Sequence, residues 1–204
     1  MDFLKLKEFL QTHLSHLVRE RDPYLATGGH FFVQQYIKQQ LSLWGTVETH
    51  KFEVRGEIYQ NLILNLPAIA NSGKKAPILI GAHYDAVPGS PGADDNATGV
   101  AVLLELARAF AEQPLTYPVR LIAFDCEESG MLGSTAYAND LWQQKQPLRL
   151  MLSLEMLGYC DRTPGSQRYP IPLLKRFYPD RGDFIALIGN AIAIPDLFRL
   201  NRSM

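Results

Sequence analysis

Hydrophobic residues in the first part of the chain recur at helical spacing. Between residues 3 and 18 they stand mostly three or four positions apart, which predicts an amphipathic helix. Pro23 interrupts this pattern, and a second helix is expected over residues 31–44. Apolar and polar residues then alternate in TVETHKFEVRG and EIYQNLILNLP. This alternation predicts an antiparallel hairpin that turns near Gly56.

The second part of the chain carries short, nearly continuous apolar runs. Three of them, PILIGAHYD, YPVRLIAFDCEE and LRLMLSLEMLG, are typical of strands buried on both faces, and a fourth strand is expected over residues 181–190. Helical patterns over residues 95–113 and 133–145 alternate with the strands, and a last helix is expected from residue 194. The alternation predicts an α/β fold with three layers, α/β/α, around a mixed but mostly parallel central sheet. We interpret residues 161–183 as a long surface loop.

Composition narrows the class of protein. A chain of 204 residues with 47% hydrophobic and 20% charged residues excludes disordered, collagen-like and coiled-coil proteins, and we expect one domain over residues 1–204. The formal net charge of −1 provides no basic field for nucleic acid. The apolar runs are too short for a membrane span, and the start of the chain lacks the features of a signal peptide. We therefore expect a cytoplasmic protein without a nucleic-acid or membrane partner, and of open oligomeric state.

Acidic residues and one histidine follow the three central strands. If these strands are parallel, their carboxyl ends meet at one edge of the sheet, where α/β folds bind ligands. Clustered carboxylates repel one another, and a bound cation relieves this repulsion. A histidine with carboxylates and no thiolate suits Zn²⁺ or a related divalent ion. The residues concerned are His83 and Asp85 after the first strand, Asp94 and Asp95 at the following helix, Glu127 and Glu128 after the second strand, and Glu155 after the third.

Three segments carry these residues: GAHYDAVPGSPGADDNATG, FDCEESGMLGS and LSLEMLGY. In their order and spacing they resemble the signature segments of zinc metallopeptidase family twenty-eight, which includes bacterial leucyl-type aminopeptidases, glutamate carboxypeptidases and, more distantly, glutaminyl cyclases. The resemblance covers roughly residues 10–190. It implies a zinc-exopeptidase-like fold, a site that holds two zinc ions when complete, and a hydrolase that acts on peptides.

The resemblance also implies a role for each residue of the first metal site. His83 matches a zinc-binding histidine, and Asp85 matches the carboxylate that orients its ring. Asp95 matches the aspartate that bridges the two metals. Glu155 stands where the family has an acidic ligand of the first metal.

Two neighbouring glutamates match the remaining functions of the family site. Glu127 matches the general base, which takes a proton from the attacking water and delivers it to the leaving amine. Glu128 matches a ligand of the second metal. The substrate implied by the aminopeptidases of the family is a peptide with a free N-terminus.

The sequence departs from the family pattern near its end. The family's last metal ligand is a histidine, but no histidine follows Asp95, so the first site is complete while the second has only Asp95 and Glu128. Of the other histidines, His30 is a candidate substitute. The chain is expected to lack the family's C-terminal segment and could hold one zinc ion. Three alternatives stay open: an aminopeptidase, an inactive metal-binding remnant, and an acyltransferase similar to glutaminyl cyclases.

Some neighbouring residues have a simpler interpretation. Asp94 and Asp125 are expected to support the structure around the ligands rather than to bind the metal. A catalytic thiol would need a histidine base, so Cys126 is interpreted as a small buried residue.

Overall fold

The computed structural model describes residues 2–69 and 75–203, and the chain forms two compact units, Met1–Leu157 and Gly158–Met204. The expected single domain over residues 1–204 stays a prediction. Among the described residues, no helix combines the length and apolar character needed to cross a membrane.

The first unit is built on a five-stranded sheet with the strand order β1-β2-β4-β3-β5. β3 pairs in parallel with β4 and β5, whereas β2 pairs antiparallel with both β1 and β4. The strands are β1 (Val47–Val54), β2 (Glu57–Leu66), β3 (Ile78–His83), β4 (Val119–Phe124) and β5 (Leu150–Ser153).

The sheet is mixed, which corrects the prediction of a mostly parallel one. The expected hairpin forms, but its second strand continues the sheet beside β4, with Leu64 opposite Leu121. Two of the four strand pairings are consequently antiparallel. A hairpin pattern in the sequence predicts its internal pairing and contains no information about the strand it will join.

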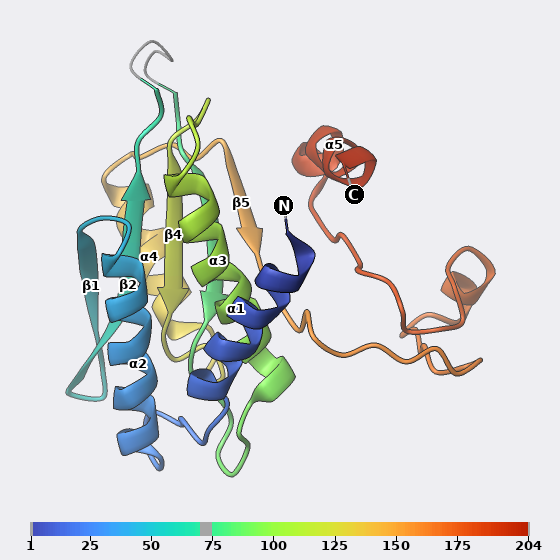
Figure 1. The fold of residues 1–204 in the computed structure, drawn as a ribbon, viewed down its shortest axis with the longest axis horizontal. Helices are drawn as coiled ribbons and strands as arrows, with labels where there is room; N and C mark the ends of the chain where they lie inside the picture. Colours follow the sequence, from blue (N-terminus) through green and yellow to red (C-terminus); the bar gives the residue numbers. More distant parts are fainter. Residues whose placement is uncertain (1, 70–74, 204) are drawn as a thin grey trace. The chain divides into compact units, whose positions relative to one another are not determined.

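Helices cover both faces of this sheet (Figure 1). α1 (Phe3–Leu17), α2 (Thr27–Ser42) and α3 (Gly99–Ala111) pack on one face, and α4 (Leu132–Gln143) packs on the other. Side chains alternate between the two cores, since Leu62 and Leu64 belong to the first and Ile63 packs with Tyr137 in the second. The expected α/β architecture with helices on either side is therefore present.

The strand directions bring one edge of the sheet together. In the parallel ladders His83 lies opposite Phe124, and Gly81 lies opposite Ser153, so β3, β4 and β5 end at the same edge. Because β2 runs the other way, its first residues and the turn at Gly56 also lie at this edge (Figure 1). The loops after three strands and the tip of the hairpin thus surround a common region.

The second unit contains little regular structure. It comprises α5 (Ile194–Ser203), two short 3₁₀ helices, Pro172–Arg176 and Ala191–Ala193, and an isolated bridge between Asp161 and Gly182. The expected last helix corresponds to α5. The expected strand over residues 181–190 does not form, because an apolar run becomes a strand only when a neighbour accepts its hydrogen bonds.

Candidate metal centre

His83, the last residue of β3, stands at the centre of the cluster. Its ring is almost completely buried, with 3% of the side chain exposed. Nδ1 lies 3.3 Å from Asp85 Oδ1, on the protein side. Nε2 points the other way, 2.9 Å from Asp95 Oδ1 and 3.4 Å from Glu155 Oε1. The ring therefore presents one nitrogen to acidic side chains from two different loops.

Asp85 connects this ring to the turn that follows β4. Its fully buried carboxylate accepts hydrogen bonds from the backbone N–H groups of Glu127 and Glu128, each at 3.0 Å. The same oxygen that accepts from Glu127 faces His83. One side chain thereby fixes the imidazole and the backbone of both glutamates.

Asn96 links the loop of Asp95 to that of Glu155. Its Oδ1 accepts from the N–H group of Gly99, the first residue of α3, at 3.1 Å, and its Nδ2 donates to the carbonyl of Leu154 at 2.8 Å. The bond from Asn96 to Leu154 was not predicted, because nothing local in the sequence identifies a carbonyl acceptor 58 positions away.

Arg21 supports the same loop from the segment between α1 and α2. The guanidinium is buried and donates to the carbonyls of Tyr84 at 2.8 Å, Pro91 at 2.5 Å and Gly92 at 2.7 Å. Burial lowers its pKa to about 10, against the attraction of nearby carboxylates such as Asp85. The sequence analysis missed this residue, and a single arginine in a loop gives no signal of such a role.

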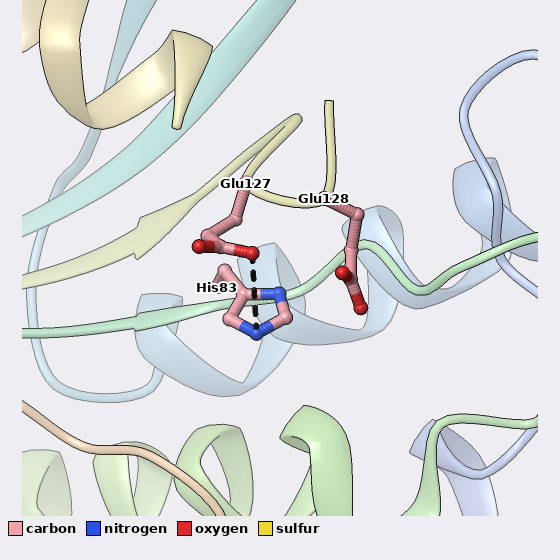
Figure 2. Close-up of side chains that lie close together, drawn as sticks. All are labelled: His83, Glu127 and Glu128. Atoms are coloured by element: carbon pink, nitrogen blue, oxygen red, sulfur yellow. Dashed lines mark ion pairs between the residues drawn. The ribbon is translucent and has the colours of Figure 1, made fainter. Parts of the chain in front are cut away.

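Two overlapping groups of side chains could hold a cation, and in each group one ligand atom per residue lies within 4.8 Å of the others. The first is His83, Asp95 and Glu155, the set expected for the first metal. The second is His83, Glu127 and Glu128, shown in Figure 2, where Glu127 Oε2 lies 4.0 Å from His83 Nε2. Glu128 is thus grouped with Glu127 rather than with Asp95.

His30, the candidate substitute ligand, belongs to neither group. Its Nε2 lies 2.7 Å from Asp125 Oδ1, and its ring stacks on that of Tyr84. The Tyr84 hydroxyl donates to the other oxygen of Asp125 at 2.6 Å. Asp125 therefore stabilises the start of the turn after β4 through two buried contacts. This agrees with its expected role in supporting the structure around the ligands. Cys126 is buried beside it, and burial together with Asp125 raises the pKa of its thiol, which disfavours a thiolate nucleophile.

The electrostatics of the cluster favour a bound cation. Burial lowers the pKa of His83, but the carboxylates of Asp85 and Glu155 outweigh this effect and raise it to about 10. A proton on His83 thus supplies the positive charge that the surrounding carboxylates require. Burial also raises the pKa of Glu127 and of Glu128, and nearby carboxylates add to this effect.

This donor set fits zinc. Imidazole nitrogen and carboxylate oxygen both bind Zn²⁺, and catalytic zinc sites with three protein ligands keep a further position open for water or substrate. The buried Asp85 beneath the ring fits the usual orientation of a zinc-binding histidine, in which the second nitrogen is held by a carboxylate. The side chains of Asp95 and Glu155 are about half exposed, at 47% and 46%, so an ion could reach them.

The chain is similar to several known proteins. The sequence profile of Peptidase family M28 matches residues 61–178, more than half of the chain. The uncharacterized protein YfbL of Escherichia coli is 40% identical over 169 residues, which cover 76% of this chain and 50% of YfbL. Aminopeptidase YwaD of Bacillus subtilis is 42% identical over 82 residues, which cover 40% of this chain and 18% of YwaD.

The fold is also shared with a solved structure. The glutaminyl cyclase of Porphyromonas gingivalis superposes with a TM-score of 0.61 at 25% sequence identity, over 75% of this chain and 58% of the cyclase. The present chain spans about half the length of YfbL and less than a fifth of YwaD.

Proposed function

The chain belongs to peptidase family M28, and from this premise we propose that it is a zinc-dependent exopeptidase of the aminopeptidase type. The observation that carries the proposal is the group of His83, Asp95 and Glu155, with the carboxylate of Glu127 beside it. His83, Asp95 and Glu155 would hold the ion, and Glu128, which the structure groups with His83 and Glu127, is the proposed ligand of a second one. A bound Zn²⁺ would supply Lewis-acid polarisation of the scissile carbonyl and a lowered pKa of the attacking water.

Two other side chains of the cluster have separate proposed roles, in positioning and in proton transfer. Asp85 holds His83 Nδ1, so that Nε2 stays directed at the ion, and it holds the backbone of Glu127 in place. Glu127 is 35% exposed, and its carboxylate can therefore receive a proton from water at the site. It then returns that proton to the leaving amine of the product. A raised pKa suits this exchange, because a base works best when its pKa approaches the working pH.

Peptides with a free N-terminus are the proposed substrates. The support comes from the family and from the name of Aminopeptidase YwaD, which is 42% identical to this chain over 82 residues. A glutaminyl cyclase-like acyl transfer is the second candidate. It is favoured by the fold shared with the cyclase and by a three-residue metal group that is complete without Glu127 and Glu128. The third alternative is a metal-binding protein without turnover.

Hydrolysis of leucine p-nitroanilide by the Zn²⁺-loaded protein tests the proposal. We expect release of nitroaniline that a chelator abolishes and Zn²⁺ restores. Glu127→Gln should remove the activity while keeping the metal, and Glu8→Gln, on the exposed face of α1, should leave both unchanged. A folded, metal-loaded protein that releases ammonia from an N-terminal glutamine peptide, and no nitroaniline, would indicate the acyltransferase. No turnover of either substrate would refute both enzymatic proposals and favour the metal-binding protein without turnover.

A further inference from the structure

A second cleft, of about 530 Å³, lies at the same edge of the sheet as the metal centre. It is formed by the start of α2, the loop before it and the first residues of β2, and no residue of the two candidate metal groups lines it. His30 lines it and connects it to the turn after β4 through the bond to Asp125. Its volume falls in the range of small-molecule sites. It is therefore a separate feature, beside the metal centre, that the proposed reaction does not use.

Three aromatic side chains contribute to the walls of this cleft. Tyr24, Phe31 and Tyr59 all line it, and the rings of Tyr24 and Tyr59 meet edge to face with centroids 5.8 Å apart. Tyr24 is 40% exposed and Phe31 is 62% exposed, so their rings are available to a ligand. The faces of such rings carry negative potential and attract organic cations.

A carboxylate without a counter-charge stands among these rings. Glu57, at the start of β2, lines the cleft and forms no ion pair within the part of the chain that the structure describes. Neither lysine nor arginine occurs among the described lining residues. Lys51 and Arg55 lie on the same hairpin, but they do not line the cleft.

The polar groups at the floor are already engaged with one another. Gln34 donates to the Tyr84 hydroxyl at 2.8 Å and accepts from Gln60 at 2.8 Å. His30 faces Asp125, which lies beneath the floor. The chain's own side chains therefore satisfy the floor, and they leave the carboxylate and the aromatic faces for a ligand.

We propose that this cleft binds an organic cation, an alkylammonium or guanidinium group, between the aromatic rings and Glu57. The rings would contact the cation through their faces, and the carboxylate would balance its charge. Such a group could come from a small free ammonium compound or from a basic side chain of a peptide. The site needs neither the metal nor turnover, so its failure would leave the proposed hydrolase untouched.

Nuclear magnetic resonance titration of the full chain tests the proposal with two matched pairs of probes. Choline is compared with 3,3-dimethylbutan-1-ol, its neutral analogue of the same shape. N-acetyl-arginine amide is compared with N-acetyl-citrulline amide in the same way. We expect saturable shifts of the backbone amides of residues 24–31 and 57–60 with at least one cation and none with its neutral partner. Binding of choline alone indicates a free ammonium ligand, and binding of the arginine derivative alone indicates a peptide side chain.

Substitutions locate the binding. Glu57→Gln and Tyr59→Leu should each weaken it about two- to fivefold. Glu53→Gln removes the same charge from the same hairpin outside the cleft and should leave binding unchanged. The amide spectrum shows whether each variant keeps the fold. The proposal is wrong if the neutral probes bind equally well, if the shifts centre on His83 and Glu127, or if no cation produces shifts.

Discussion

Replacement of Asp85 with asparagine removes a charge and one acceptor oxygen from beneath the metal centre while keeping the shape of the side chain. Asp85 accepts from the N–H groups of Glu127 and Glu128, each at 3.0 Å, and faces His83 Nδ1 at 3.3 Å. An asparagine amide has only one oxygen. At least one of the two partly buried N–H groups must therefore face an NH₂ group and lose its acceptor.

The magnitudes follow from these contacts. An unsatisfied buried donor costs about 1–3 kcal/mol, so the free energy of unfolding should fall by that amount. Loss of the carboxylate has two opposing effects on metal binding, because Asp85 attracts both the competing proton on His83 and the ion itself. Coulomb attraction scales with charge, so a divalent ion loses more than the proton does. Removal of such a supporting carboxylate typically lowers metal affinity about 10- to 100-fold.

Competition against a chromogenic chelator measures the Zn²⁺ affinity of Asp85→Asn, and urea unfolding measures its stability. Glu8→Gln controls for the change in net charge, since Glu8 is exposed on α1. A folded Asp85→Asn protein with the affinity of the original chain would refute the claim that Asp85 organises the centre.

Three further predictions concern other buried groups. Arg21→Lys should lower the free energy of unfolding by about 3 kcal/mol, because a lysine ammonium lacks the planar guanidinium that reaches the carbonyls of both Tyr84 and Gly92. An unchanged urea unfolding curve would contradict this prediction. Burial lowers the pKa of His13 despite its contact with Glu105, so the folded state binds fewer protons than the unfolded state. Stability should therefore fall as the pH drops below about 6.5, and His13→Gln should reduce this dependence; an identical pH profile for the variant would count against it. Zn²⁺ binding at pH 7 should release about one proton from His83, because the pKa of this side chain is raised to about 10. Calorimetry in buffers of different ionisation enthalpy would count the released protons, and binding without release would show that His83 is not protonated at pH 7.

Local patterns predicted most of the elements of the first unit. Amphipathic spacing identified α1 and α2, and the apolar runs identified β3, β4 and β5. Burial of one or both faces requires apolar residues at a regular spacing, which is visible in the sequence. The parallel pairing of these three strands then placed His83 near the acidic residues of the following loops. Short-range periodicity and the rule that parallel strands end at the same edge are enough to predict these features.

Long-range pairing was the part that the sequence could not provide. The place of the hairpin beside β4 and the absence of a strand over residues 181–190 both depend on which segments become neighbours. The same holds for Arg21 and Asn96, whose partners are backbone carbonyls. Every residue has such a carbonyl, so no residue type at a distance indicates the bond.

Equilibrium dialysis against Zn²⁺ followed by elemental analysis tests whether His83, Asp95 and Glu155 form a metal site. We expect at least one ion per folded chain, retained in Asp94→Asn and lost in Asp95→Asn and in Glu155→Gln. Asp94 is the matched control, because it neighbours Asp95 but belongs to neither candidate group. A folded chain without bound zinc, or equal occupancy in all three variants, would contradict the account.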